Sequence, residues 1–200
     1  MEINEVISNV HVYGLEDAAR GSKYSFAVDL EKVSGEITPT VRKLAACGLG
    51  EGHDNFLNGV VVQFDLTFTN KAWVEAERYH FLDFVSSQST MHRITKFDLD
   101  KAFIEYTDKR MIAILKEMVA DYNETAARDA KDPSLPEKYL RILYSTPSGL
   151  RLTAKMTTNY RQLKTIYRQR KNHRLPEWRT FCAWIETLPE SGLITGNIEE

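Results

Sequence analysis

The sequence predicts an α+β fold, because strands and helices are mixed without the regular strand-helix-strand rhythm of a parallel sheet. Two segments carry this prediction. Residues 59–93 read as a strand, then an amphipathic helix, then a polar loop, and residues 150–171 read as a second strand followed by a helix. The chain has 200 residues, 42% of them hydrophobic, and no linker-like composition divides it. We therefore expect a single domain over residues 1–200.

The first sixty residues predict one strand and short helices. Residues 5–13 alternate as a strand and end at Gly14, and residues 15–21 look like a short helix that leads into Ser22–Phe26. Residues 40–47 read as one or two helical turns closed by Gly48. The next stretch, 48–59, is rich in glycine, but a strand follows it rather than a helix. It is therefore not expected to be a dinucleotide-binding loop.

The central unit begins with alternating apolar residues at positions 60, 62, 64, 66 and 68, as expected of a strand with one buried face. Asn70 is positioned to cap a helix whose apolar stripe extends to Leu82 and includes His80. The polar stretch 86–90 follows, with His92 and Arg93 after it. Hydroxyl, amide and basic groups suit an anionic, oxygen-rich ligand better than a core.

The second half predicts a helix from residues 107–108 onward that fades in the polar stretch 123–132, and a helix capped by Ser134. Residues 150–158 alternate, so the polar face of this strand presents Arg151 and Lys155. The helix after residue 159 has an apolar stripe, and its basic residues share a connected face. Pro176 opens a last helix. The basic face of the helix comprises Arg161, Lys164, Arg168 and Lys171.

Charge is unevenly distributed, although the net charge is only -2. Residues 141–179 contain ten Lys or Arg residues and one acid, Glu177, so the local surplus is 10 − 1 = 9 positive charges. Such a surplus favours an anionic partner, either nucleotide phosphate or nucleic acid. A solvated basic surface is the alternative.

The two cysteines, Cys47 and Cys182, cannot form a disulfide framework, and neither lies in a C-x-x-C or His-rich stretch. This favours a reducing compartment and argues against a thiolate metal site, so we expect no metal. The first ten residues lack the charged and apolar regions of a signal peptide, and no apolar run approaches the length of a membrane span. The protein is expected to be cytoplasmic, without a membrane partner.

Several motifs occur in an order that matches one known family. They are Lys23-Tyr24-Ser25-Phe26; Gly52-His53-Asp54-Asn55-Phe56; Tyr79-His80-Phe81 followed after seven residues by Ser89; and Thr157-Thr158-Asn159-Tyr160-Arg161-Gln162-Leu163, continuing to Pro176-Glu177-Trp178. In this order they resemble the A-R-V-S-F, G-H-x-x-x-F, R-H-R-x7-S and T-x-N-x-R-S-L-x-x-F-L-x-L-R segments of the flavin-dependent thymidylate synthases, the ThyX family. The resemblance covers most of the chain and implies a ThyX-like fold, with a central, largely antiparallel sheet flanked by helices.

The chain departs from the family pattern at positions that matter for chemistry. Tyr79 and Phe81 replace both signature arginines, and Arg78 is the nearest substitute. The family's arginine two residues after the serine is Met91 here, so Arg93 would serve only with an insertion in the loop. We assign Lys171 to the position of the family's uracil-binding arginine. A lysine keeps the charge but loses the planar fork that grips two ring atoms.

The resemblance implies a homotetramer that binds FAD and dUMP at subunit interfaces. Reduced FAD would supply hydride, methylenetetrahydrofolate the carbon and NADPH the reducing equivalents. Lys171 and Ser89 would be the catalytic residues, Ser89 as a phosphate or ribose donor rather than a nucleophile. The implied FAD contacts are Ser25, His53, Asn55, His80, Asn159 and Arg161; the implied substrate contacts are Arg78, Ser89, Arg93, Arg151 and Lys171.

Three classes of function follow. The first is an active flavoenzyme that methylates or otherwise alkylates a uracil nucleotide such as dUMP. The second is a catalytically lapsed protein of the same fold that binds nucleotide or flavin. The third is a nucleic-acid-binding protein that uses the basic region 141–179. On residue type alone, His80 also fits a core histidine, His53 a turn residue, and Arg161 and Lys171 solvated helix charges.

Overall fold

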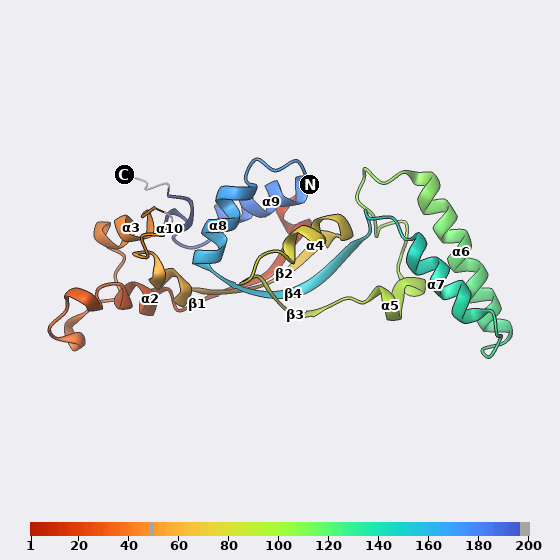
Figure 1. Ribbon diagram of the computed structural model, residues 1–200, viewed down its shortest axis with the longest axis horizontal. Helices are drawn as coiled ribbons and strands as arrows, with labels where there is room; N and C mark the ends of the chain where they lie inside the picture. The colour runs from red at the N-terminus through yellow and green to blue at the C-terminus, as the bar shows by residue number, and fades with distance from the viewer. Residues whose placement is uncertain (49, 197–200) are drawn as a thin grey trace. The chain divides into compact units, whose positions relative to one another are not determined.

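The computed structural model describes residues 1–48 and 50–196 (Figure 1). Elements named η are 3-10 helices. In chain order the elements are α1 (Ile3–Val6), β1 (Ile7–Tyr13), α2 (Leu15–Gly21), η1 (Tyr24–Phe26), η2 (Leu30–Lys32), α3 (Pro39–Ala45), η3 (Asn55–Gly59), β2 (Val61–Thr69), α4 (Asn70–Ala76), β3 (Asp83–Ser87), α5 (Thr90–Arg93), η4 (Ile94–Lys96), α6 (Lys109–Arg128), α7 (Leu135–Ser145), β4 (Arg151–Asn159), α8 (Tyr160–Arg170), α9 (Pro176–Ile185) and α10 (Gly192–Thr195).

The strands form one four-stranded antiparallel sheet in the order β1-β2-β4-β3. In the register of β1 with β2, Ile7 lies opposite Leu66 and Tyr13 opposite Val61, with an irregularity between Ser8 and His11. A mixed set of helices and an antiparallel sheet confirms the predicted α+β class. None of the helices in the described ranges is both long and apolar enough to cross a membrane.

The chain divides into two compact units. The first contains the described parts of residues 1–66, 75–86 and 155–200, and the second contains residues 67–74 and 87–154. Each unit has buried side chains of its own, as described below. That residues 1–200 form a single domain stays a prediction.

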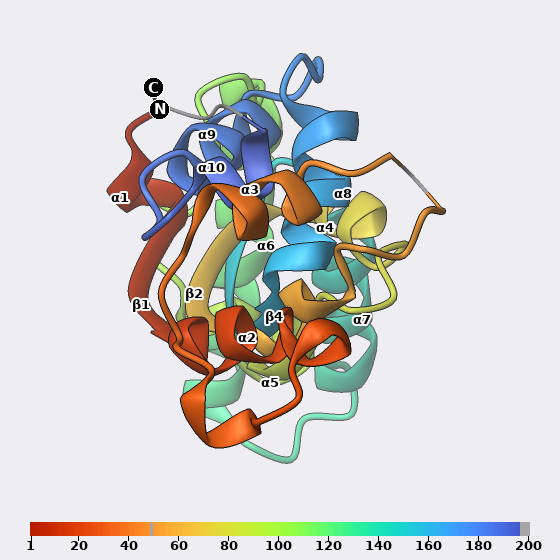
Figure 2. The same ribbon diagram turned by 90° about the vertical axis from the view of Figure 1, so that its left-hand side faces the viewer.

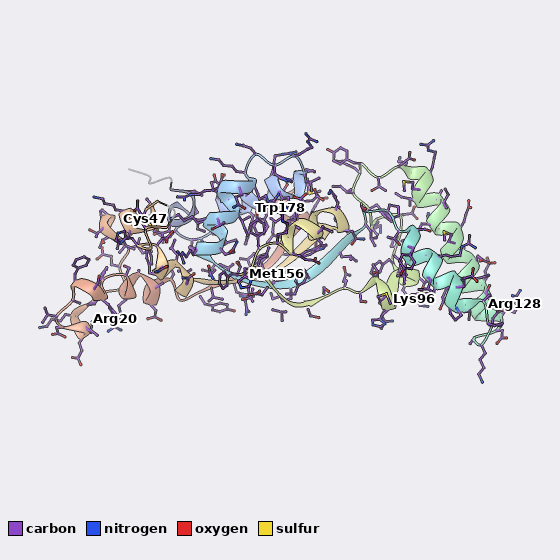
Figure 3. All side chains as sticks on the ribbon, viewed as in Figure 1. Arg20, Cys47, Lys96, Arg128, Met156 and Trp178 are labelled. Carbon is purple, nitrogen blue, oxygen red and sulfur yellow. The ribbon has the colours of Figure 1, made fainter. Side chains whose placement is uncertain are left out.

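The core of the first unit is built where β2 and β4 meet α8 and α9. Phe64 and Leu66 are fully buried, and the rings of Phe64 and Trp184 lie 4.7 Å apart between centroids. Met156 on β4 and Trp178 on α9, both labelled in Figure 3, are also fully buried. Helices α8 and α9 pack against each other (Figure 2). Aromatic groups in tilted contact dominate this core, as their large apolar area favours.

Helix α8 begins after residue 159 as predicted, and Asn159 is its cap. Its Oδ1 accepts a hydrogen bond from the backbone N–H of Gln162 at 2.8 Å. This satisfies one of the free N–H groups in the first helical turn. The predicted apolar stripe of this helix is buried: Tyr160, Leu163, Ile166 and Tyr167.

The second unit has a core of Ile94, Leu99, Leu115, Val119, Ile142 and Leu150, contributed by segments around α6 and α7. Helix α6 starts as predicted, since the side chain of Asp108 accepts from the N–H of Arg110. It runs to Arg128, beyond the point where its apolar pattern fades, and Lys138 on α7 binds Asp121 and Thr125 there. Ser134 is the N-cap residue of α7 as predicted, but its hydroxyl makes no capping hydrogen bond and donates to the carboxylate of Asp132 instead.

The helix predicted from Asn70 to Leu82 is shorter than expected. It ends at Ala76, and residues 77–82 form turns. The buried ring of Tyr79 hydrogen-bonds Gln169 and Arg170 on α8, and the hydroxyl of Thr158 donates to the carbonyl of Phe81. The Tyr79 hydroxyl donates to Gln169 and accepts from Arg170, which fixes this side chain outside the helix, and the bond from Thr158 gives the Phe81 backbone carbonyl a partner there. His80 is consequently exposed, so its predicted place on a buried stripe is wrong.

The polar stretch 86–90 is not simply a loop. Ser86 and Ser87 complete strand β3, and Gln88 pairs with Thr153: its N–H donates to the Thr153 carbonyl at 2.9 Å, and its Oε1 accepts from the Thr153 N–H at 2.9 Å. Only residues 88–89 separate β3 from α5. The serines here are strand residues beside β4, because the sheet supplies hydrogen-bond partners that the local sequence does not reveal.

Candidate functional site

Three of the predicted FAD contacts, Ser25, His53 and Asn55, line one cavity of about 740 Å³ in the first unit. Ser25 belongs to η1, and His53 and Asn55 lie where the glycine-rich loop enters η3. The lining also includes Phe26 and Phe56 together with small residues. Among the residues that the structure describes, no Lys, Arg, Asp or Glu lines this cavity. A concave, largely apolar wall with a few hydroxyl and amide groups is typical of a site for an organic cofactor.

Two further predicted FAD contacts, Asn159 and Arg161, line a smaller cavity of about 180 Å³ in the same unit. Asn159 is also the cap of α8, so its amide oxygen is already engaged. Arg161 follows in the first turn and is half-buried. The same cavity is lined by Asp54, Asn58 and Lys164, so it is far more polar in residue type than the first.

Asp54 is the electrostatic centre of this smaller cavity. Its buried carboxylate accepts a hydrogen bond from the ammonium of Lys164 at 2.6 Å and pairs with the Nε of Arg161 at 3.3 Å. Burial by itself would raise the pKa of the Asp54 carboxyl, but the hydrogen bond from Lys164 and the charges of Lys164 and Arg161 together lower this pKa below its ordinary value. Asp54 is therefore a carboxylate over the whole physiological range.

Lys164 was expected on the basic face of α8, and this is wrong. The residue is only 3% exposed. Besides Asp54, its ammonium donates to the carbonyl of Ala45 at 2.6 Å and to that of Cys47 at 3.2 Å. A buried ammonium needs acceptors for its three N–H groups, and here the segment 45–54 supplies all of them. No local sequence pattern indicates this pairing, since Asp54 lies 110 positions away from Lys164.

The loop and short helix 50–59 thus face two cavities. His53 and Asn55 line the larger one, whereas Asp54 and Asn58 line the smaller one. Consecutive side chains in this segment point in different directions, so neighbouring residues serve different cavities. Because His53 and Asn55 are the chain neighbours of Asp54, a contact that fixes Asp54 also restrains these two residues.

A second cluster surrounds Arg170 in the last turn of α8. Its Nε donates to the hydroxyl of Tyr79 at 2.6 Å, and its Nη1 donates to the carboxylate of Glu75 at 2.7 Å. The guanidinium lies 5.4 Å from the centroid of the Tyr79 ring and 4.9 Å from that of Trp178, which are cation–π distances. Tyr79, which stands at the first arginine of the signature, is thus a buried packing residue, as expected of an aromatic group there.

Lys171 is the next residue and has a different environment. It is exposed at the end of α8, with its ammonium 5.6 Å from the centroid of the Tyr167 ring. The motif T-x-N-x-R-S-L-x-x-F-L-x-L-R, counted from Arg161, reaches its second arginine at Arg170, one residue before Lys171. The two residues are therefore separate candidates for the same role, one half-buried and held, the other free to move.

Neither His80 nor Arg78 is among the residues that line the two cavities. Both are exposed in the turns of residues 77–82, and the ring of His80 packs edge-on against Phe81. Phe81 itself lines the smaller cavity. The predicted FAD set is therefore divided: five members line two cavities, and His80 does not.

The remaining predicted substrate residues belong to the second unit. Ser89 immediately precedes α5, and its carbonyl accepts from the N–H of Arg93 at 3.1 Å, so both share one helical turn. Arg151 is half-buried at the start of β4. The pairing of Gln88 with Thr153 places Ser89 near the same stretch of β4.

Acids from outside residues 141–179 reduce the predicted basic surplus. Lys155 pairs with Asp65 at 3.5 Å, Lys164 with Asp54, and Arg170 with Glu75. Within residues 1–48 and 50–196, no three His, Cys, Asp or Glu side chains are grouped so that they could hold a metal ion. The electrostatic case for a large polyanionic partner is weaker than the sequence suggested.

The comparisons with known proteins identify the fold. No family model and no curated protein matches the chain. Among solved structures, one of the flavin-dependent thymidylate synthase ThyX from Helicobacter pylori, complexed with FAD and dUMP, matches with a TM-score of 0.66 at 14% identity over 100% of both chains. A second ThyX structure from the same organism, with FAD and dUMP, matches with a TM-score of 0.67 at 15% identity over 94% of this chain and 97% of that one. The chain has a ThyX-like fold.

Proposed function

We propose that this protein binds FAD and acts as a flavin-dependent thymidylate synthase-like enzyme that methylates or otherwise alkylates a uracil nucleotide such as dUMP. One observation carries the proposal: within a ThyX-like fold, Ser25, His53 and Asn55 line a cavity of about 740 Å³, a size suited to an organic cofactor. The similar structures contain FAD and dUMP. The proposal includes a homotetramer in the cytoplasm that uses NADPH and methylenetetrahydrofolate.

In this proposal Ser25, His53 and Asn55 contact FAD from the larger cavity, and Asn159 and Arg161 from the smaller one. Reduced FAD would supply the hydride for the methylation. Arg161 is the residue best suited to an anionic group of the cofactor, because its guanidinium is only partly neutralised by Asp54 and remains half-exposed. His80 would have to reach the cofactor from its exposed turn.

The proposed nucleotide contacts of the second unit are Ser89, Arg93 and Arg151, and those of the first unit, considered by itself, are Arg78 and Lys171. Ser89 offers a hydroxyl donor, and the arginines offer paired N–H groups for phosphate. In the chemical step, a cation beside the uracil ring would stabilise the negative charge that develops on the ring oxygen. Lys171 is our candidate for that role, and the adjacent Arg170 is the alternative.

FAD titration tests the proposal directly. Saturating FAD should raise the melting temperature, since a ligand that binds only the folded state stabilises it by about 2.7 kcal/mol at one hundred times its Kd. Arg161→Ala removes a charge-assisted hydrogen bond of about 1.5–3 kcal/mol and should weaken FAD binding roughly tenfold to a hundredfold. Arg168→Ala is the matched control, because Arg168 is exposed on the same helix and lines neither cavity.

The outcomes separate the three classes of function. FAD binding with turnover of dUMP supports the enzyme. FAD binding without turnover of dUMP, dCMP or their ribonucleotide counterparts supports the lapsed protein. If FAD, FMN and nucleotides all leave the melting temperature unchanged while oligonucleotides bind, the flavin proposal is wrong and a nucleic-acid-binding protein replaces it.

A further inference from the structure

Lys164 has no assigned role, yet it is the most completely buried cation of α8. Its side chain is 4% exposed, and its ammonium makes contacts with Asp54, the Ala45 carbonyl and the Cys47 carbonyl. A lysine this buried is costly unless all its N–H groups are satisfied. An apolar side chain of the same size would fill this space at a lower free-energy cost, so packing alone does not explain why a lysine is buried at position 164.

All three acceptors belong to one segment of the chain. Ala45 is the last residue of α3, Cys47 lies two positions further along the chain, and Asp54 immediately precedes η3. One ammonium on α8 therefore ties down both ends of the segment 45–54. Glycine-rich segments lose much conformational entropy when they become ordered, and they need such restraints to hold one arrangement.

The restraint acts on both cavities. Asp54 lies between His53 and Asn55, which line the larger cavity, and its other carboxylate oxygen pairs with Arg161, which lines the smaller one. A change at Lys164 would free Asp54, and through it would move three of the proposed FAD contacts at once. A ligand that needs groups from both cavities binds well only if these groups are held in advance.

We propose that Lys164, acting through Asp54, is a positioning residue that holds His53, Asn55 and Arg161 in place for an anionic cofactor. Lys164 also lines the smaller cavity, but its ammonium is already engaged by Asp54 and by the carbonyls of Ala45 and Cys47, so its role is to hold these groups. The identity of the cofactor as FAD rests on the proposed function, whereas the clamp on the segment 45–54 does not.

The test compares Lys164→Met with Arg168→Met in the full-length protein. Methionine keeps the length and apolar stem of lysine and removes its charge, and Arg168 is exposed on the same helix. Without any ligand, Lys164→Met should speed amide hydrogen exchange in the described part of residues 45–55 by about tenfold or more, with β2 and α9 unchanged. It should also shift the imidazole NMR signals of His53. Arg168→Met should do neither.

A second arm measures FAD affinity well below the melting temperature. Lys164→Met should weaken FAD binding roughly tenfold or more, and Asp54→Asn should do the same, while Asp54→Asn combined with Lys164→Met should cost no more than about the larger single effect. Such non-additivity marks two residues that act as one unit. If Lys164→Met does not fold, Asp54→Asn, which keeps the shape of the side chain, decides in its place.

The two arms separate the two proposals. Unchanged exchange in 45–55 and unchanged His53 signals in both Lys164→Met and Asp54→Asn would overturn the clamp, whether or not FAD binds. Equal weakening of FAD binding by Lys164→Met and Arg168→Met would also overturn it. If the wild-type protein binds no FAD but Lys164→Met loosens the segment, the clamp stands and only the flavin assignment fails.

Discussion

Lys171 and Arg170 are neighbours in sequence but have opposite surroundings. Arg170 is held by Glu75 and Tyr79 and stacks on two aromatic rings, so its position is defined by the fold. Lys171 is exposed, and its ammonium lies 5.6 Å from the centroid of the Tyr167 ring. A held guanidinium is preorganised for a planar ligand, whereas a free lysine can follow its ligand but loses more side-chain entropy on binding.

We expect Lys171→Ala to reduce turnover of a uracil nucleotide by about a hundredfold to a thousandfold, the usual effect of removing one donor that stabilises the charge developing on the ring oxygen. The melting temperature should hardly change, because an exposed helix-end lysine contributes within about 0.5 kcal/mol to stability. The assay is deuterium exchange at C5 of dUMP together with product formation from methylenetetrahydrofolate and reduced FAD.

Arg170→Lys is the matched comparison at the adjacent position, because it keeps the charge and removes the planar fork. Full turnover in Lys171→Ala together with lost turnover in Arg170→Lys would move the ring-binding role from Lys171 to Arg170. A third variant, Lys171→Arg, tests which base the enzyme is adapted to. An enzyme adapted to dUMP should tolerate it, whereas one adapted to a different base should lose activity with its own substrate.

Among the elements, helix α8 contributes residues to both the smaller cavity and the Arg170 cluster. Its first turn carries the Asn159 cap and Arg161, its middle buries Lys164, and its last turn holds Arg170. The helix is joined to the segment 45–54 by a charge pair, and a charge pair has a pH dependence that apolar packing lacks.

The Asp54–Lys164 pair predicts a stability loss in acid. The folded-state pKa of Asp54 is lowered, so its stabilising contribution is complete above the unfolded-state pKa of about 4 and is lost as the pH falls through the lower folded-state pKa. Protonation leaves the buried Lys164 without its counter-charge, which typically costs about 3–5 kcal/mol for a buried pair. The wild-type melting temperature should therefore drop steeply below about pH 4.

Asp54→Asn provides the control for this pH profile. It should be less stable than wild type at pH 7, and its melting temperature should fall less between pH 7 and pH 3 because the titrating group is gone. Thermal melts at several pH values measure both. Parallel pH profiles for the two proteins would show that Asp54 does not govern the acid limb.

On the scale of the whole molecule, the second unit exposes large apolar side chains on its two main helices. On α6 these are Met111 and Ile114, and on α7 they are Leu140 and Tyr144, of which Tyr144 is 89% exposed. Large apolar side chains exposed on neighbouring helices are the kind of groups that protein-binding surfaces use. They support the proposed homo-oligomer.

We expect the purified protein to be a tetramer at micromolar concentration, and Leu140→Lys to shift it toward smaller species, because a lysine ammonium is costly to bury between apolar surfaces. Size-exclusion chromatography with light scattering measures the mass. Glu117→Lys, an exposed charge change on α6, is the control. A wild-type protein that is monomeric at every concentration would contradict the tetramer and with it a cofactor site shared between subunits.

The sequence by itself determined the α+β class, the strands at β2 and β4, the buried stripe of α8 and the start of α9 at Pro176, because periodicity and helix-start signals are local properties of the chain. It also selected Ser25, His53, Asn55, Asn159 and Arg161, which line two cavities. Their roles toward FAD stay predictions. These residues were found through motifs, each of which is a short, continuous run of the chain.

Only the tertiary structure decided which charges are buried and where the helix after Asn70 ends. Lys164 looks like one more basic residue on a polar face until Asp54 is brought to it, and Tyr79 lies outside α4, where its hydroxyl bonds to Gln169 and Arg170. In both cases the partner is roughly a hundred residues away in sequence, and a pair of side chains at that separation leaves no periodic pattern in either local stretch. Burial and pairing of charged groups are properties of the folded chain, whereas periodicity is a property of the sequence.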